Sequence, residues 1–341
     1  MGLKRTTIND LAAKLKISKS TISKALKGYP DVSDKTRKKV LRLAKKLNYK
    51  PNSIASSLRT RQTKTIGVIV PSVVHDFFSK VIDGIIQEAE NKNYLVILLQ
   101  SGEHADLEEK QLNLLKNKQV DGILLSVSNE TGIKERLNKI LEKGIPVVLF
   151  DKIIKSFECS KVIIDDKLAA YNAVSYLINK GYKRIAHFGG VLTAQNSIDR
   201  FLGYKQALID NNLTFNPDLV YINPNNDDIN DGYSNAEKML KEHTDIDAVF
   251  AITDLIALGV YKYFNEINIR IPKDIAVFGF SDWLISSVIT PNLSTVKQPS
   301  FEMGRKAVEI LIDEIKNINN NTDFSFQNIV LPTSLIIRKS T

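Results

Sequence analysis

Residues 17–28, ISKSTISKALKG, combine three lysines, three serines and a threonine with no acidic residue. In a helix that begins after Ser18, the side chains of Ile22, Ala25 and Leu26 lie on one face and pack inward. The opposite face then presents Lys19, Ser20, Ser23, Lys24 and Lys27. Lysine donates hydrogen bonds to guanine base edges, while hydroxyl groups and helix N-terminal amides bind phosphates. This helix is therefore predicted to enter the major groove of DNA; the alternative is a solvated polar face.

Two further helices have to hold this one in place. Thr7 is the N-cap of the first, and Asp10 three residues later completes a capping-box pattern. Ser18 is the N-cap of the second helix and Ser33 that of the third. Residues 16–17 alone separate the first two helices, and such tight spacing is typical of a helix-turn-helix.

The net charge of +9 is unevenly distributed along the chain. Residues 1–65 contain 18 Lys and Arg but three acids, whereas the remainder has 29 basic and 35 acidic residues. A strongly basic segment on a mildly acidic body indicates a head that binds a polyanion. The alternative is a disordered basic tail, but such a tail would not show the apolar pattern of packed helices.

Residues 51–64 join this head to the rest of the chain. Pro51 ends the third helix, and Asn52 is a candidate N-cap for a short helix in which Ala55 and Leu58 share a face. A helix of about two turns is only marginally stable alone. We therefore expect this hinge to become ordered when the protein binds DNA.

From Thr65 onward, short β-branched runs alternate with amphipathic helices. The strand candidates are TIGVIV, YLVILL, DGILLS, PVVLFD, KVIID, RIAHFG, DAVFAI and DIAVFGF. Helices are expected between them, for example over residues 79–91, 107–117, 168–180 and 198–210. This alternation predicts parallel sheets covered on both faces. A stretch of about 275 residues is too long for one open sheet, so we expect two similar lobes.

Ligands of two-lobed α/β proteins bind at the carboxyl ends of the strands. The polar residues that directly follow strand candidates are Asp151, Asp165, Thr253, Asp254, Ser281 and Asp282. Asn196 and Arg200 are four residues apart and share one helix face. An arginine there donates paired hydrogen bonds to hydroxyls or to a carboxylate. Because Asp and Thr also cap helices, a structural role is the alternative for each of the strand-end residues.

Several kinds of chemistry have no signature in the chain. It contains no GxxxxGK[ST] phosphate loop, no GxGxxG fingerprint and no GxSxG nucleophile elbow. The histidines, at His75, His104, His187 and His243, lack metal-ligand spacing, and Cys159 has no partner for an internal disulfide. We therefore expect no catalytic residue, no metal and no cofactor; an enzyme such as a sugar kinase is the alternative.

The same features bear on location. No apolar run approaches the ~20 residues that span a membrane. The basic N-terminus lacks the apolar segment of a secretory signal, and a single cysteine fits a reducing compartment. We therefore expect a cytoplasmic protein with no membrane partner.

The run from TINDLAAKLKISKSTISKALKGYPDVS to NYKPNSIASSLRT closely resembles the LacI-type (LacI/GalR family) bacterial transcriptional regulators. TKTIGVIVPSVVHDFFSKVIDGI, QVDGILL, GYKRIAHFGG, DRFLGYKQAL, AVFAITDLIALG and IPKDIAVFGFSDW are similar to successive core motifs of that family, in the right order. The resemblance implies an all-α helix-turn-helix head and an α/β two-lobed core with parallel sheets, like the type I periplasmic binding proteins. It also implies a regulator, usually a repressor, that binds a near-palindromic double-stranded DNA operator as a homodimer and is switched by a small-molecule effector.

The implied domain division has three parts. Residues 1–50 form the DNA-binding domain, residues 51–64 the hinge, and residues 65–341 the effector-binding and dimerisation core. Within the core, the N-lobe covers about 65–160 plus 293–325, and the C-lobe about 161–292 plus 326–341. No heptad extension follows SLIIRKST, which favours a dimer over a larger assembly.

The resemblance also assigns roles to residues of the head and hinge. The base-reading positions of the recognition helix are Lys19, Ser20 and Lys24. The positions that contact the phosphate backbone are Thr7, Ser18, Ser23, Ser33 and Tyr49. In the hinge, Ala55 and Leu58 match the pair that enters the minor groove, where two leucines wedge open the central base step. Asn52 would cap the hinge helix, and Arg59 would reach phosphate or the groove edge.

In the core, HDFF resembles the segment in which aromatic and polar side chains meet the effector. The implied effector contacts are His75, Asp76, Phe77, Phe78, Asp151, Asn196, Arg200, Thr253, Asp254, Ser281 and Asp282. Two departures fall in this pocket. Ser281 stands where relatives usually carry Asp after the aromatic residue, with Asp282 one place later, and HDFF replaces an Asn-Pro-Phe-Phe type of opening.

Because both departures lie in the pocket, the effector class stays open. We expect a carbohydrate or its metabolite; the alternatives are a nucleobase, or control by a phosphorylated carrier protein that docks on the core. Outside the regulator class, a solute-binding protein is the alternative, which the basic head argues against.

Overall fold

The computed structural model describes residues 6–49, 62–128, 132–222 and 228–341. The chain divides into two compact units, Met1–Thr63 and Lys64–Thr341, and each is described by itself. The predicted hinge residues Asn52, Ala55, Leu58 and Arg59 lie outside the described residues.

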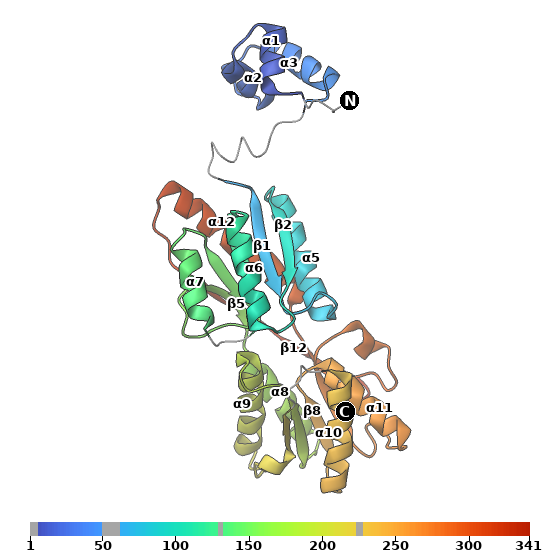
Figure 1. Ribbon diagram of the computed structural model, residues 1–341. Coiled ribbons are helices and arrows are strands. Elements are labelled where there is room, and N and C mark those ends of the chain that lie inside the picture. Colours follow the sequence, from blue (N-terminus) through green and yellow to red (C-terminus); the bar gives the residue numbers. More distant parts are fainter. Residues whose placement is uncertain (1–5, 50–61, 129–131, 223–227) are drawn as a thin grey trace. The chain divides into compact units, whose positions relative to one another are not determined.

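The helices of the head are α1 (Ile8–Leu15), α2 (Lys19–Leu26) and α3 (Asp34–Lys46), drawn in blue in Figure 1. Thr7, Ser18 and Ser33 are their N-caps, and each side chain accepts a hydrogen bond from a backbone N–H in the first turn. Thr7 and Asp10 form the predicted capping box. The apolar side chains buried between the helices are Leu11, Ile22, Ala25, Val32, Val40 and Ala44. The three helices therefore share one small core, as their apolar pattern predicts.

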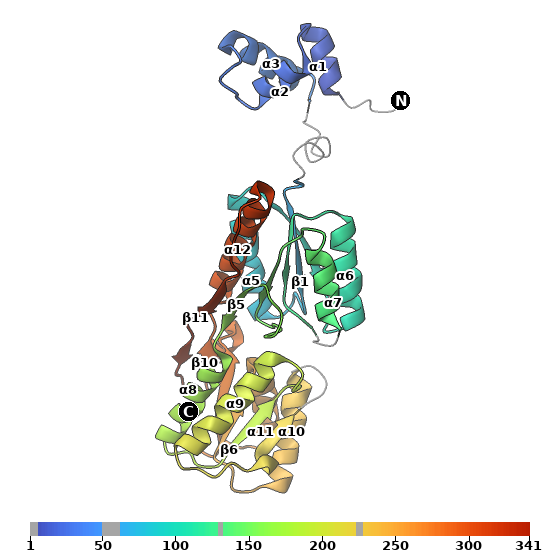
Figure 2. The same ribbon diagram turned by 90° about the vertical axis from the view of Figure 1, so that its left-hand side faces the viewer.

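The N-lobe of the second unit contains a parallel six-stranded sheet with the order β11–β5–β4–β3–β1–β2. Its strands are β1 (Thr65–Val70), β2 (Leu95–Gln100), β3 (Gly122–Leu125), β4 (Val147–Phe150), β5 (Ser160–Ile164) and β11 (Asn328–Leu331). Its helices are α5 (Asp76–Asn91), α6 (Ala105–Asn117), α7 (Ile133–Leu141) and α12 (Ser300–Asn320). Figure 2 shows α5 and α12 on one face of the sheet and α6 and α7 on the other. Every residue of β3 and β4 is buried, as expected for strands between two helical layers.

The C-lobe contains a second six-stranded sheet with the order β12–β10–β9–β8–β6–β7, in which only the β10–β12 pair is antiparallel. Its strands are β6 (Ile185–Gly189), β7 (Val220–Ile222), β8 (Ala248–Ala251), β9 (Ala276–Ser281), β10 (Ser294–Lys297) and β12 (Ser334–Ile336). Its helices are α8 (Asp166–Asn179), α9 (Gln195–Asp210), α10 (Ile229–Glu242) and α11 (Asp254–Glu266). The pair α8 and α9 packs on one apolar cluster and the pair α10 and α11 on another, so both faces are covered.

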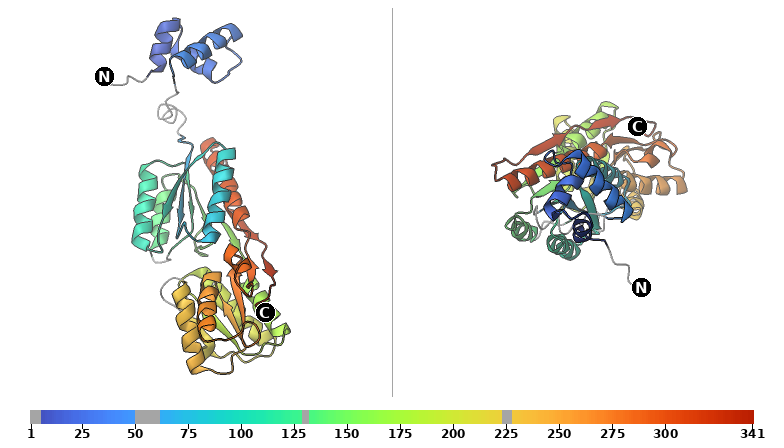
Figure 3. Two further views of the ribbon diagram at one scale, coloured as in Figure 1. Left: turned by 90° about the vertical axis from the view of Figure 1, so that its right-hand side faces the viewer. Right: turned by 90° about the horizontal axis from the view of Figure 1, so that it is seen from above.

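The chain passes from one sheet to the other after β5, after β10 and after β11. These crossings lie side by side at one edge of the core, where Figure 3 shows β10 beside the chain that leaves α12. The sequence-based boundaries at 160/161, 292/293 and 325/326 fall a few residues too early. The reason is that β5, β10 and β11 each complete the sheet of the lobe that the chain is about to leave.

Glycines allow α5 and α12 to touch. A Cβ atom on Gly84 would lie 2.1 Å from the carbonyl oxygen of Phe301, and one on Gly304 would lie 2.0 Å from that of Val81. Both distances are far below van der Waals contact, so a larger residue would push the helices apart. This contact holds the start of α12 beside α5, at the edge of the cavity described below.

The four helices predicted by range are present as α5, α6, α8 and α9, and each begins two or three residues earlier than its pattern suggests. All eight strand candidates are strands. The shorter elements β7, β10, β11 and β12 were not predicted. They have three or four residues each and, unlike the equally short β3, β4 and β8, none is a continuous run of buried apolar residues.

Candidate nucleic-acid interface and effector cavity

The exposed face of α2 carries the predicted base-reading residues. Lys19, Ser20 and Lys24 are exposed, whereas Ile22 and Ala25 on the opposite side are fully buried. This is the orientation that the apolar spacing predicts. The first turn of α2 contains no acidic residue, so the positive end of the helix dipole is left available for an anion.

Lys24 has a partner inside the head. Its ammonium group forms an ion pair and hydrogen bond with the carboxylate of Asp31, in the loop between α2 and α3. The hydrogen bond and charge of Asp31 raise the pKa of Lys24. To bind a base edge, Lys24 must either break its hydrogen bond to Asp31 or use another of its N–H donors.

The predicted backbone contacts gather at helix N-termini. The Ser18 hydroxyl accepts a hydrogen bond from Thr21 N and pairs with the Ser20 hydroxyl at 2.7 Å. Thr7 and Ser33 occupy the equivalent places on α1 and α3, and both are exposed. Such N-termini offer free amides to phosphates. Ser23 and Tyr49 are half-buried, and Tyr49 packs on the core of the head.

In the second unit, a cavity of about 290 Å³ lies between the two sheets, at the carboxyl ends of their strands. Segments that follow β1, β2, β3 and β4 line it from the N-lobe, and segments that follow β6, β8, β9 and β10 line it from the C-lobe. This is the place where the strand-end rule predicts a ligand.

Eight of the eleven predicted effector contacts line this cavity. They are His75, Phe77, Phe78, Asp151, Asn196, Arg200, Thr253 and Ser281. The structure thus brings together residues from both lobes that are more than 200 positions apart in the chain.

The other three predicted contacts do not line the cavity, and each has partners elsewhere. Asp76 forms an ion pair with Lys80 on α5. Asp282 accepts a hydrogen bond from Arg338 at 2.6 Å. Asp254 is fully buried, and its carboxylate accepts hydrogen bonds from its own lobe. Burial raises the pKa of Asp254, while those hydrogen bonds act in the opposite direction.

Arg200 is the most firmly held of the cavity residues, with 4% of its surface exposed. Its Nε donates to Asp166 Oδ1 at 2.8 Å, and its Nη1 donates to the carbonyl oxygen of Ile252 at 2.7 Å. The guanidinium also lies 3.8 Å from the centre of the Phe280 ring. Within the described parts of the chain Nη2 makes no hydrogen bond, so it can donate one to a ligand.

Glu103, Asp151 and Lys152 line the N-lobe side of the cavity. Lys152 and Glu103 form an ion pair, and Asp151 stands beside them with a left-handed backbone at φ 57°. Burial raises the pKa of Asp151 to about 7, against the opposing charge of Lys152. Burial and the charge of Lys152 lower the pKa of His75. Burial therefore favours the neutral forms of both His75 and Asp151 in this wall.

Sequence reasoning missed several residues of the cavity. They include Gln100, Glu103, Ser128, Lys152, Trp283 and Gln298. Gln100 ends β2 and Ser128 closely follows β3, so the strand-end rule would have found both had it been applied to every strand. Gln298 follows β10, a strand that was not predicted. No local signal identifies Trp283.

The described residues contain neither a cluster of metal ligands nor a membrane-spanning helix. Among these residues no group of three or more His, Cys, Asp or Glu side chains is placed to hold a metal ion. Of the helices in the described ranges, none is long and apolar enough to cross a membrane.

Two family models match the chain. Residues 7–52 match the bacterial regulatory proteins of the lacI family. Residues 63–339 match the model of periplasmic binding proteins and the sugar binding domain of the LacI family. The two matches fall on the two units of the structure.

Known proteins match over the full length. The ribose operon repressor of Haemophilus influenzae is 32% identical over 334 residues, covering 98% of both chains. The solved structure of a transcriptional regulator CelR–cellobiose complex is 26% identical, with a TM-score of 0.75, and covers 99% of this chain and 100% of that one. The lac repressor dimer bound to operator and the anti-inducer ONPF, at 24% identity and a TM-score of 0.85 over 99% of both chains, shares the fold.

Proposed function

The chain belongs to the LacI family of bacterial transcriptional regulators, and from that premise we propose a repressor whose small effector occupies the cavity between the core lobes. Regulators of this family bind operator DNA and small-molecule effectors, and they function as dimers. Occupancy of the cavity would change the affinity of the dimer for a near-palindromic operator. The observation that carries the proposal is the pairing of an exposed, acid-free face on α2 with a cavity lined from both lobes.

In the head, the proposed base contacts are Lys19, Ser20 and Lys24, and the proposed backbone contacts are Thr7, Ser18, Ser23, Ser33 and Tyr49. Exposure of the first set on α2 supports its role. The N-caps among the second set stand where free helix amides meet phosphate. The hinge contacts Asn52, Ala55, Leu58 and Arg59 remain predictions from sequence.

The proposed effector is a carbohydrate or its metabolite. The charged groups of the cavity are largely paired with each other, Arg200 with Asp166 and Lys152 with Glu103. Among the described residues this site has no unpaired cation for a phosphate, whereas its paired side chains can exchange hydrogen bonds with hydroxyl groups. Proteins named for ribose and cellobiose among the similar ones support the same class.

Coupling between the cavity and the head requires two states of the core. An effector shifts operator affinity only by as much as its own affinities for the two states differ. Because side chains from both lobes line the cavity, a ligand that contacts both favours one relative position of the lobes. We propose that this position orders or releases the hinge.

Two alternatives stay within the regulator class. A nucleobase would use the aromatic and amide side chains of the cavity. A phosphorylated carrier protein would bind the outside of the core and leave the cavity unused. We also propose that the protein acts in the cytoplasm and catalyses no reaction.

The test has two stages and uses the full-length protein. Selection from random DNA duplexes should return a near-palindromic site. A thermal-shift screen with sugars, sugar phosphates and nucleobases should then give one class that raises the unfolding midpoint and alters operator affinity. Selection of no site would contradict the DNA-binding role, and a hit among nucleobases alone would replace the carbohydrate proposal.

A further inference from the structure

Trp283 lines the cavity but belongs to none of the sites assigned above. It is the single tryptophan of the chain and follows β9 in the C-lobe. Its indole reaches the N-lobe wall, where the ring centres of Trp283 and His75 lie 5.5 Å apart at an angle of 59°. The side chain thus forms a wall of the cavity that contacts both lobes.

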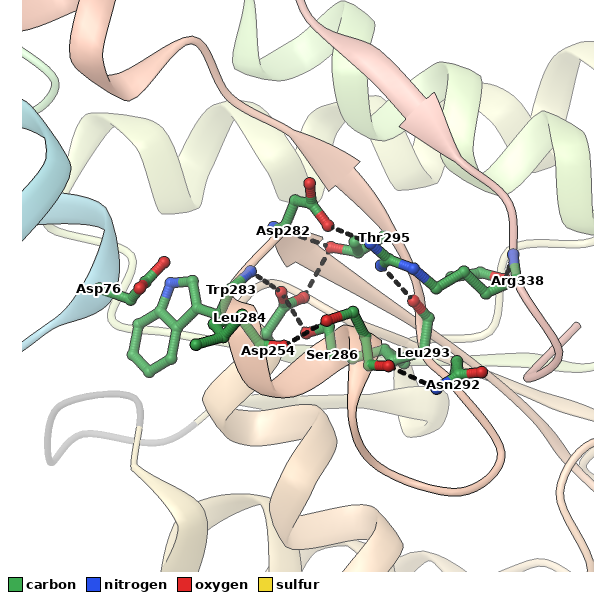
Figure 4. A network of polar contacts seen from close by, with 12 residues as sticks. Asp76, Asp254, Asp282, Trp283, Leu284, Ser286, Asn292, Leu293, Thr295 and Arg338 are labelled. Carbon is green, nitrogen blue, oxygen red and sulfur yellow. Dashed lines mark hydrogen bonds and ion pairs between the residues drawn. The ribbon is translucent and has the colours of Figure 1, made fainter.

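The indole N–H has no partner of its own. Trp283 Nε1 is buried, and within the described residues it makes no hydrogen bond. An indole nitrogen is a donor only, and a buried tryptophan usually finds an acceptor for it. Figure 4 shows the Asp76 carboxylate beside the indole nitrogen, but no hydrogen bond joins the two, and Asp76 forms an ion pair with Lys80. A bound molecule with an acceptor oxygen would satisfy the N–H.

Asp254 holds the turn that carries Trp283. Its Oδ2 accepts from Trp283 N at 2.8 Å and from Ser286 Oγ at 2.7 Å, and its Oδ1 accepts from Thr295 Oγ1 at 2.6 Å (Figure 4). The turn at residues 283–286 and strand β10 are thereby tied to one buried carboxylate on α11. The peptide of Trp283 is consequently a fixed support for the indole.

The two residues before Trp283 have an unusual backbone. Ser281 and Asp282 have φ angles of 122° and 55°. Residues other than glycine rarely adopt positive φ angles. Arg338 from the C-terminal segment binds the Asp282 carboxylate and so secures the turn. A strained backbone that is held by several contacts is typical of ligand sites.

We propose that Trp283 is a specificity-determining contact for the effector, which packs its indole against the apolar face of a sugar ring and donates its N–H to a ring or hydroxyl oxygen. This inference rests on the proposed carbohydrate effector. Asp254 acts as a positioning residue through the turn and does not touch the ligand. Ser281 stands where relatives usually carry an aspartate that contacts the effector. In this chain the indole of Trp283 would supply a contact in place of that carboxylate.

The experiment uses the full-length protein and three neutral sugars, ribose, glucose and cellobiose, with glucose 6-phosphate as a charged comparison. Each compound is titrated by calorimetry while the emission of Trp283 is recorded. A bound sugar should shift the emission with the same midpoint as the heat signal. Trp283→Phe, which keeps a ring but lacks the N–H, should bind about three- to tenfold more weakly. Trp283→Leu should bind about thirtyfold more weakly or worse.

The matched control is Leu284→Ala, because the neighbouring Leu284 is 71% exposed and does not line the cavity. It should leave sugar affinity unchanged. The melting midpoint and the sugar-free operator affinity of Trp283→Phe should equal those of the wild type, which shows that the fold is intact. An unchanged emission at saturating sugar, or normal binding by Trp283→Leu, overturns the role of Trp283 alone. Binding of none of the neutral sugars by the wild type overturns the carbohydrate proposal and this contact with it.

Discussion

Arg200 and Asp166 form a buried ion pair, with Arg200 Nε 2.8 Å from Asp166 Oδ1 and both side chains less than a tenth exposed. Arg200 belongs to α9 and Asp166 to the first turn of α8, directly after the chain enters the C-lobe. The pair presents the arginine to the cavity and also joins two helices. Arg200 therefore has a structural role in addition to the ligand contact that its sequence position predicts.

Arg200→Ala should lower the free energy of unfolding by about 3–5 kcal/mol, because it leaves the Asp166 carboxylate buried without a partner. It should also abolish the effector response. Urea unfolding measures the first effect and operator binding with and without effector the second. The control is Arg270→Ala, which breaks the exposed ion pair with Asp274 and should lower the free energy of unfolding far less, because water screens an exposed pair. Equal losses for the two variants would mean that the buried pair is not structural.

Asp31→Asn should tighten DNA binding, because it frees the Lys24 ammonium group for the operator. Lys24→Ala should relax discrimination at one base pair, with a loss of about 1–3 kcal/mol. Gel-shift titrations on single-substituted operators measure both. Asp34→Asn raises the charge of the head equally but acts on α3, so it is the matched control and should leave base preference unchanged. A Lys24→Ala variant that lost affinity equally for all sequences, with a flatter salt dependence, would make Lys24 a phosphate contact.

Glu314 on α12 should make the core less stable as the pH rises. It is 3% exposed, and burial raises the pKa of its carboxyl from 4.5 to about 7, although the Ser160 hydroxyl hydrogen-bonds to it. Between these values the unfolded chain loses the proton that the folded protein keeps. Stability present below pH 4.5 is therefore lost as the pH rises to 7, by about 3 kcal/mol in total.

Glu314→Gln should remove this dependence, since the amide stays neutral and its oxygen still accepts from Ser160. The variant should be more stable than the wild type at pH 8 and similar to it at pH 4, in thermal unfolding at both pH values. Glu135→Gln changes an exposed glutamate on α7 and should leave the wild-type dependence in place. A Glu314→Gln variant less stable than the wild type at pH 8 would show that the carboxylate is needed in the core.

Leu58→Ala should weaken binding to the operator about tenfold or more and change non-specific binding little, because it removes the predicted minor-groove wedge. Competition between operator and random duplex measures the ratio. Leu41→Ala is a matched substitution at an exposed leucine of α3 and should leave the ratio unaltered. Equal weakening on both DNAs by Leu58→Ala would argue against the hinge contact.

Much of the head follows from its sequence, because its structure is local. The caps Thr7, Ser18 and Ser33, and the burial of Ile22 and Ala25, depend on residues within one or two helical turns. In the core, the alternation of strands and helices likewise identified both lobes, and the strand-end rule found most of the cavity. The short strands β10 and β11 were not predicted, and the two crossings between lobes that follow them were therefore placed a few residues too early.

The strand-end aspartates show what only the tertiary structure decided. Asp151 and Asp254 both stand at strand ends, yet Asp151 lines the cavity and Asp254 is buried away from it. Asp254 is directed inward because Thr295 and Ser286, some 30 to 40 residues later, converge on its carboxylate, and Arg338 does the same for Asp282. The residue types and periods along the chain thus determined the head, the layered core and the edge at which a ligand binds. Which side chains face that ligand depended on hydrogen-bond partners that only folding brings together.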